Sequence, residues 1–335
     1  MSKFKLPLSV ALILLAASPA YAVYSTAALS GPALSRAVSV QLAASELEQA
    51  RAGLTRVQGD PLALRPDLMA AQARLQQAEA SQRLTGLQVR AALAAELATL
   101  SGAEYDLRLA QARSELAALN LQAAQVRRNA GAATALDLEN AQTEATNAAA
   151  AVTQAKEALA AAQAAVKARA GTLPAAAKTL SFPQPKLETL RSGLAQHPRL
   201  LRAQAEAEKA ELDLTIKSTD LSAPVEVQAA RDALLGARKN VEDTQLDLTA
   251  KLNEAWQTYS AARSTVQSRQ RSAAGAAEQA RVQESRFSAG LVSRAELLKA
   301  RTAALEAEAQ LDAARASLET ALSNLSVAAN LKVWQ

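Results

Sequence analysis

The sequence predicts an all-α protein of long antiparallel coiled-coil helical hairpins, arranged as two tandem structural repeats. Three observations support this fold class. Hydrophobic residues make up 50% of the 335 residues but aromatic residues only 3%, so the chain lacks the large side chains that fill a globular core. Apolar residues recur at alternating steps of three and four, and one long stretch of the chain resembles another.

The internal similarity is clearest around two glycines. The stretch RRNAGAATALDLENA (residues 127–141) resembles RFSAGLVSRAELLKA (residues 286–300). Aligning Gly131 with Gly290 gives an offset of 159 residues, and the register then holds for roughly 40 residues. The sequence therefore predicts a duplicated helical unit.

A second similarity lies upstream and gives a different offset. RPDLMAAQARLQQAEA (residues 65–80) resembles HPRLLRAQAEAEKAEL (residues 197–212), and Pro66 aligns with Pro198 at an offset of 132. This alignment predicts that the second repeat holds 27 more residues than the first (159 less 132) between its proline and its glycine. We assign the extra length to KSTDLSAPVEV (residues 217–227), the least helical stretch of that half.

Each glycine is followed by a row of residues with coiled-coil spacing, which we call the hairpin seam. A repeat of 3.5 residues is typical of helices that wind around each other. In the first repeat the seam comprises Leu138, Ala141, Ala145, Ala148, Val152, Ala155, Leu159, Ala162 and Val166. In the second it comprises Leu297, Ala300, Ala304, Ala307, Leu311, Ala314, Leu318, Ala321, Leu325 and Ala328.

The residues around each glycine predict a helix–turn–helix tip. Gly131 can adopt the left-handed conformation that ends a helix. Thr134 can then cap the next helix, and Asp137 three residues later completes a capping box. The second copy has Gly290, Ser293 and Glu296 at the same places. The helical arms on either side predict hairpins of roughly 45 to 90 Å.

The ends and joints of the chain predict an exported protein of two halves. Lys3 and Lys5 precede an apolar stretch, and Ala20-Tyr21-Ala22 matches a cleavage site, so residues 1–22 read as a signal peptide. Residues 23–169 are predicted as the first hairpin repeat and residues 191–335 as the second. Residues 170–190 contain three prolines and are predicted as the linker.

Composition argues against several functions. The chain has no Cys and one His, so we expect no disulfide, no metal site and no cofactor. No Ser-His-Asp set or phosphate loop is present, so an enzyme is not expected. The net charge is only +5, and positive and negative residues alternate along the chain, so nucleic acid is not an expected partner. Arg301, Glu308 and Arg315 recur every seven residues and either flank the seam, which we favour, or face a water-filled lumen.

At this point the sequence resembles a known family. RFSAGLVSRAELLKARTAALEAEAQL (residues 286–311) and its partner in the first half are similar to the periplasmic tip motif of the TolC-type outer-membrane efflux family. PKLETLRSGLAQHPRLLRAQAEAEKAELDL (residues 185–214) resembles the opening of the family's repeat, and LTAKLNEAWQTYSAARSTV (residues 248–266) resembles its descending helix.

The resemblance implies a homotrimer whose subunits each give two hairpins to a twelve-helix periplasmic tunnel. It also implies tips that bind a periplasmic adaptor, which couples the tunnel to an inner-membrane pump. Carried over by position, the partner-binding residues of the tips are Arg127, Gly131, Thr134, Asp137, Leu138, Arg286, Gly290, Ser293, Glu296 and Leu297.

One departure from the family is expected. Its members add four strands per subunit to an outer-membrane β-barrel, and this sequence shows no four alternating strands, so we expect little or no barrel. The resemblance implies a passive conduit for efflux or type I-like secretion, exported to the periplasm and associated with the outer membrane. The alternative is a periplasmic coiled-coil scaffold that spaces the layers of the envelope.

Overall fold

Eight α-helices account for most of the chain. The computed structural model describes residues 24, 26–174, 182–219 and 222–333, so the predicted signal peptide lies outside the described residues. The helices are α1 (Thr26–Arg36), α2 (Val38–Gly59), α3 (Arg65–Asn129), α4 (Ala135–Ala170), α5 (Leu187–Leu194), α6 (Pro198–Lys217), α7 (Pro224–Ser288) and α8 (Arg294–Ala329). Within the described part of the chain no helix is long and apolar enough to cross a membrane.

The helices occur as two series of matching length, as the predicted duplication requires. Helices α3 and α7 have 65 residues each, and α4 and α8 have 36 each. Both pairs begin and end 159 residues apart, which is the offset between Gly131 and Gly290. The shorter α2 and α6 have 22 and 20 residues and also occupy equivalent places. The predicted all-helical, twofold-repeated fold is confirmed.

The alignment at an offset of 132 is wrong. It pairs Pro66 at the start of α3 with Pro198, but Pro198 begins α6, whose counterpart is α2. The residue equivalent to Pro66 is Val225 near the start of α7, so the second series contains no additional 27 residues. Helices rich in alanine, glutamine and glutamate resemble one another at many offsets, and that composition produced the false match.

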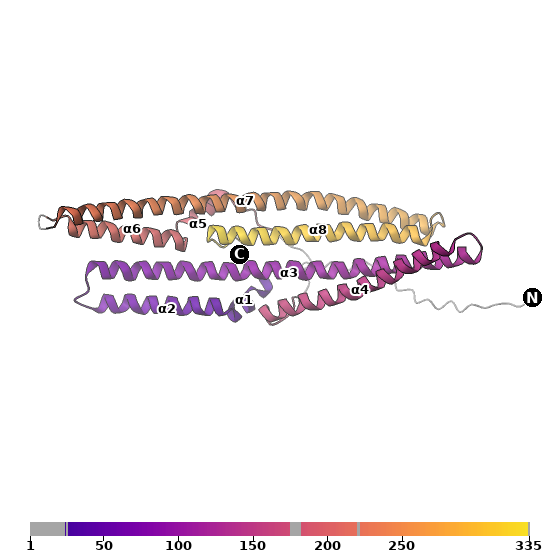
Figure 1. Cartoon of the computed structure of the whole chain (residues 1–335), viewed down its shortest axis with the longest axis horizontal. Coiled ribbons are helices and arrows are strands. Elements are labelled where there is room, and N and C mark those ends of the chain that lie inside the picture. Colours follow the sequence, from indigo (N-terminus) through magenta and orange to yellow (C-terminus); the bar gives the residue numbers. More distant parts are fainter. Residues whose placement is uncertain (1–23, 25, 175–181, 220–221, 334–335) are drawn as a thin grey trace, which may run out of the picture.

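The helices form an elongated layer in which each long helix has two shorter partners placed end to end (Figure 1). Along α3 lie α2 toward one end and α4 toward the other, and along α7 lie α6 and α8. The two series meet where α3 packs against α8 and α6. The order across the layer is therefore α7, then α8 or α6, then α3, then α4 or α2. At 1.5 Å per residue, α3 and α7 are each about 100 Å long.

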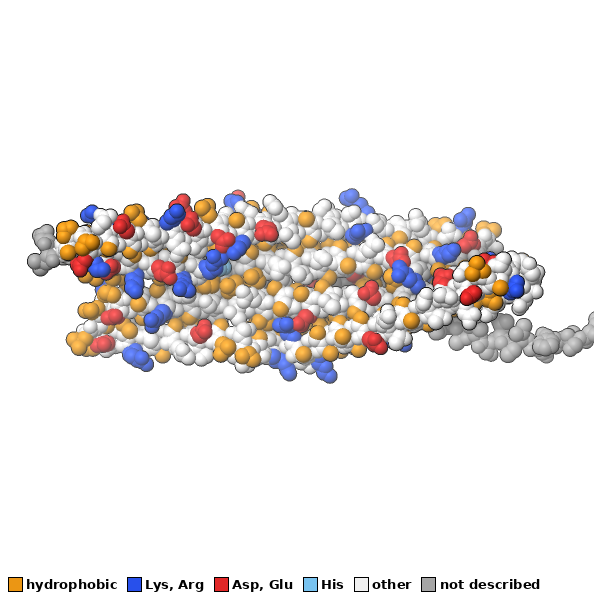
Figure 2. All heavy atoms as spheres, in the orientation of Figure 1, with side chains coloured by type: hydrophobic (Ala, Val, Ile, Leu, Met, Phe, Trp, Pro, Cys, Tyr) orange, Lys and Arg blue, Asp and Glu red, His pale blue; other side chains and the backbone are white. Residues whose placement is uncertain are grey.

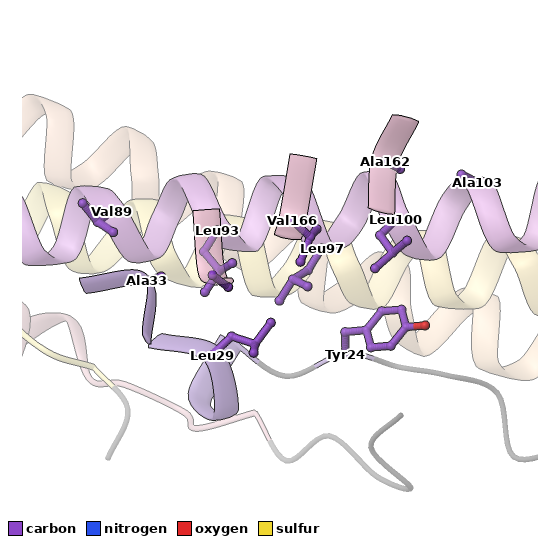
Figure 3. Packing of buried hydrophobic residues seen from close by; sticks show 11 residues of the cluster. Tyr24, Leu29, Ala33, Val89, Leu93, Leu97, Leu100, Ala103, Ala162 and Val166 are labelled. Carbon is purple, nitrogen blue, oxygen red and sulfur yellow. The ribbon is translucent and has the colours of Figure 1, made fainter. Parts of the chain in front are cut away.

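Two apolar clusters hold the layer together, one in each series. The first joins α1, α3 and α4, and Figure 3 shows Leu29 and Tyr24 facing Leu93, Leu97 and Leu100. The second joins α5, α6, α7 and α8. The two share a pattern at an offset of 159: Val89, Leu93, Leu100, Ala162, Val166 and Ala170 of the first correspond to Leu248, Leu252, Tyr259, Ala321, Leu325 and Ala329 of the second, all of them buried.

Both predicted hairpin seams face the neighbouring long helix. Every seam residue of α4 is buried or half-buried, whereas the residues between them are mostly exposed. Every seam residue of α8 is also buried or half-buried, but so are most of the residues between them, because α8 packs against both α7 and α3. In α8 the leucines at positions 311, 318 and 325 are all buried. Because alanine alternates with leucine or valine, the axes of paired helices can approach closely while the larger side chains fill the remaining space.

The short helices α1 and α5 fasten the C-terminal ends of α4 and α8. In the second series, a Cβ on Gly193 would lie 2.2 Å from the carbonyl oxygen of Ala329, so α5 touches the backbone of α8. Asn330 then ends α8 in the left-handed conformation, with φ of 49°. In the first series Gly171 ends α4 with φ of 79°, and the guanidinium of Arg36 lies against it.

Replacing Gly193 by alanine is expected to destabilise the protein by about 1 to 3 kcal/mol, since the new methyl group meets backbone that must shift. The measurement is the urea unfolding midpoint of the mature chain. Gly236→Ala is the matched control, because a Cβ there meets nothing within 4 Å and alanine in a helix interior stabilises by up to about 1 kcal/mol. Equal midpoints for the two variants would contradict the close contact between α5 and α8.

Candidate functional site: the two hairpin tips

The first tip joins α3 to α4 through a turn centred on Gly131. This glycine has φ of 73°, a conformation that residues with a Cβ rarely adopt. The N–H of Ala132 donates to the carbonyl of Arg127 at 2.8 Å, and the N–H of Gly131 donates to that of Arg128 at 3.0 Å. These two bonds satisfy carbonyl groups that the end of α3 leaves without helical partners.

The second tip, between α7 and α8, repeats this geometry. Gly290 also has φ of 73°. The N–H of Leu291 donates to the carbonyl of Arg286 at 2.9 Å, and the N–H of Gly290 donates to that of Phe287 at 2.9 Å. Arg127 and Arg286 therefore hold the same place in the two turns through their backbone carbonyls.

Both predicted capping boxes are present. Thr134 Oγ1 accepts from the N–H of Asp137 at 3.1 Å, and the Asp137 carboxylate accepts from the N–H of Thr134 at 2.8 Å. Ser293 and Glu296 make the same reciprocal pair at 3.2 and 2.8 Å. The hydrogen bonds from Thr134 lower the pKa of Asp137, and those from Ser293 lower the pKa of Glu296.

The structure divides the ten predicted tip residues into groups with different roles. The glycines allow the turns, and the four capping residues form two hydrogen-bonded pairs, one on each tip. Leu138 is half-buried and Leu297 is buried, because both begin the seams of their own hairpins. Only the side chains of Arg127 and Arg286 point to a role beyond the turn itself, since both are exposed in the last turn of a long helix.

The tips also present large apolar side chains that are not among the ten predicted residues. They are Val126 and Leu136 on the first tip, and Phe287 and Leu291 on the second, with exposed fractions of 68, 63, 40 and 72%. None of the four falls on a seam position. Both seams begin only at Leu138 and Leu297, so a large apolar residue close to a tip glycine but outside the seam is the sequence signal that could have identified them.

Arginines and acids link the second tip to the flank of α3. Arg294, the first residue of α8, donates to Glu115 at 3.1 Å, and Arg113 pairs with Glu306 at 2.7 Å. Because α8 begins beside Glu115, well before the end of α3, the first tip projects beyond the second (Figure 1). The two tips therefore lie at the same end of the molecule but at different heights.

Farther from the tips, a buried carboxylate joins the two hairpins. Asp312 of α8 is only 4% exposed and accepts a short hydrogen bond from the hydroxyl of Tyr105 on α3. Its other oxygen accepts from Arg315 at 2.9 Å. Arg301, in the same charged row as Arg315, pairs with Glu284 of α7. Both arginines therefore make ion pairs, and the position of their row relative to a lumen stays a prediction. The described residues contain no group of three or more His, Cys, Asp and Glu side chains placed to hold a metal ion.

The fold is similar to that of solved outer-membrane channels. The chain resembles the outer membrane protein VceC of Vibrio cholerae with a TM-score of 0.65 and 13% identity, covering 92% of this chain and 97% of that one. For the Campylobacter jejuni CmeC outer membrane channel the TM-score is 0.55 and the identity 13%, covering 91% of this chain and 85% of that one. For the Neisseria gonorrhoeae MtrE outer membrane channel, in its open state, the TM-score is 0.53 and the identity 15%, covering 91% of this chain and 89% of that one.

At these identities the comparison establishes the fold. The protein has the helical fold of TolC-type outer-membrane efflux channels, so the resemblance inferred from the tip motifs is confirmed at the level of structure. No family model and no curated protein sequence matches the chain.

Removing the cap of the second tip is expected to loosen it locally. Ser293→Ala deletes the acceptor for the N–H of Glu296, at a cost of about 1 kcal/mol, so amides in the first turn of α8 should exchange with solvent about fivefold faster. The control is Ser317→Ala, which removes a hydroxyl from the middle of the same helix. Unchanged exchange in Ser293→Ala would contradict the role of the cap.

The same tip should also loosen on acidification. Because the pKa of Glu296 is lowered in the folded protein, its contribution is present above the ordinary pKa of 4.5 and is lost as the pH falls through the folded value. Amide exchange in the first turn of α8, corrected for the intrinsic effect of pH, is therefore expected to accelerate below about pH 4.5 in the wild type. A Glu296→Gln variant should show a smaller change, and an equal change would exclude this carboxylate as the cause.

Proposed function

We propose that the protein is a passive channel-tunnel component for efflux or type I-like secretion, which forms a homotrimer in the periplasm and associates with the outer membrane. The tips bind a periplasmic adaptor that connects the conduit to an inner-membrane pump, and the chain itself catalyses no reaction. We also propose that residues 23–169 and 191–335 are the two repeats that each supply one hairpin. The observation that carries the proposal is a channel-type fold with two equivalent tips at one end.

The two edges of the helical layer support closure into a ring. On α4, the face opposite the seam exposes many small residues: Ala150, Ala160, Ala161, Ala164 and Ala168. On α7, the face opposite its contact with α8 exposes Ala250, Ser260, Ala261, Ser264 and Ser268. Small side chains let helices approach closely, so the α4 edge of one subunit fits the α7 edge of the next. Three copies of a layer four helices wide give a ring of twelve.

The boundary between the hairpins supports a conduit that opens. Within each hairpin, alanine and leucine pack along the seam. Between the hairpins, α3 and α8 are joined by the ion pairs of Arg113 and Glu115 and by the hydrogen bond of Tyr105 to Asp312. Exposed ion pairs contribute little stability, typically below about 1 kcal/mol, so the tip regions can separate while each hairpin stays intact.

Native mass tests the tunnel first. The mature protein, extracted from the envelope with detergent, is expected to run as a trimer, because the edges of α4 and α7 complete each other. Ala164→Glu places a charge on the proposed edge and should shift the mass to the monomer. Ala303→Glu is the control, since this exposed alanine belongs to α8, which already has a neighbour on both sides. A soluble wild-type monomer or dimer would instead favour the envelope scaffold.

The adaptor contact is tested at the second tip. A photo-crosslinking residue at position 291 is expected to capture a periplasmic adaptor in cells, identified by mass spectrometry. Gly290→Val should abolish that product, because a β-branched residue resists φ of 73° and the turn must rearrange. Gly275→Val, in the interior of α7 with open space at its Cβ, is the control. An unchanged crosslink in Gly290→Val would count against the tip as the adaptor site.

A further inference from the structure

The end of the molecule opposite the tips carries an apolar turn. Leu62 and Leu64 lie between the last residue of α2 and the first of α3. They are 84 and 65% exposed, and 84% is the largest exposed fraction among the large apolar side chains that the structure describes. Figure 2 shows apolar side chains gathered at this end of both halves of the layer. The turn lies at one end of the elongated layer, and no other described residue covers these two side chains.

The N–H groups of this turn are hydrogen-bonded within it. Asp60 Oδ1 accepts from the N–H of Leu62 at 2.9 Å, and the Asp60 carbonyl accepts from that of Ala63 at 3.1 Å. Asp67 Oδ2 accepts from the N–H of Leu64 at 3.1 Å, and Pro61 has no N–H. The N–H groups of residues 62, 63 and 64 are therefore all hydrogen-bonded within the turn. Bonded N–H groups lower the cost of placing a turn among lipid headgroups, because the acyl chains beneath offer no hydrogen-bond partners.

The ends of α6 and α7 also expose large apolar side chains here. Ile216, in the last turn of α6, is 58% exposed, and Val225, in the first turn of α7, is 74% exposed. Pro224 begins α7 and, like Pro61, has no N–H to satisfy. Each subunit therefore presents apolar side chains at two places on one end, and a trimer would present them at six places around one mouth.

The charges beside the α2–α3 turn balance each other. Two positive charges, Arg56 and Arg65, and two negative charges, Asp60 and Asp67, lie in or next to the turn. Both aspartates are also acceptors for N–H groups of the turn. These four residues have no net charge, so they do not attract the turn to anionic lipid. Contact with a membrane must therefore come from burial of apolar side chains.

We propose that this end rests on a lipid surface, with Leu62 and Leu64 of the α2–α3 turn inserted among the headgroups and upper acyl chains. The lipid is zwitterionic or neutral at the contact, because the turn offers balanced charge and a backbone without free N–H groups. The inference rests on the proposed location in the envelope. It assigns the contact with the membrane to a helical turn, and six apolar sites on one trimer would combine to hold it there.

Flotation with phosphatidylcholine vesicles tests the proposal on the mature chain, residues 23–335. The wild type is expected to float with the vesicles at both low and high salt, since apolar contacts are not screened. The double substitution Leu62→Ser, Leu64→Ser should weaken binding at least tenfold. The matched control is Leu235→Ser, Leu246→Ser, a double change of similar exposure within α7, which should bind as the wild type does. Native mass and helical content are measured for all three proteins.

Three results would overturn the proposal: no vesicle binding by the wild type, equal flotation of the double variant, or binding that needs anionic lipid and disappears in high salt. End-to-end association of copies, lost in the double variant and without flotation, would show that a second copy covers this end instead. Vesicle binding by a wild type that is not trimeric would support the lipid contact while excluding the tunnel, so the two proposals fail separately.

Discussion

The structure depends on the close pairing of helices along seams in which alanine alternates with leucine or valine. Each seam joins a helix of 36 residues to one of 65, and the described residues form no globular core that could supply stability elsewhere. Packing between helices therefore contributes over a great length, with little burial at any one point. Only at mid-length, where α1 and α5 join, does each series bury a cluster of large side chains.

This arrangement leaves the two ends free to specialise. The seams and clusters fix the middle of the molecule, so the turns at either end need only close the chain and satisfy their own backbone. At one end, the capping pairs of Thr134 with Asp137 and of Ser293 with Glu296 do this, and the exposed side chains become available for a partner. At the other end, Asp60 and Asp67 do the same for the α2–α3 turn. The residues that pack the middle of the molecule are thus different from those exposed at its ends.

Much of the fold could be predicted from the sequence, because the determining interactions are local and periodic. The glycine positions, the capping boxes and both seams follow from residue spacing alone, and all are present in the structure. The upstream alignment failed because helices of one composition match at several offsets. Helices α1 and α2 were not anticipated, since they pack on α3 through scattered residues such as Leu29 and Leu47 that no neighbouring motif marks.

The candidate site was predicted less completely. Motif comparison identified the residues that build the turns, and these are largely occupied with one another. The exposed apolar residues, such as Leu136 and Leu291, depend on the direction in which a side chain leaves the tip. The contact of Asp312 with Tyr105 joins residues 207 positions apart in the chain, and no pattern within either helix reveals it.

The unequal projection of the two tips has a consequence for symmetry. If the two hairpins ended level, a ring of three subunits would offer six nearly equal docking points. With the α3–α4 tip extending past the α7–α8 tip, the rim would instead be a crown of alternating high and low points. A partner that arrives as six copies could not make six identical contacts with such a crown. It would have to bind as three pairs, with one member of each pair reaching farther than the other.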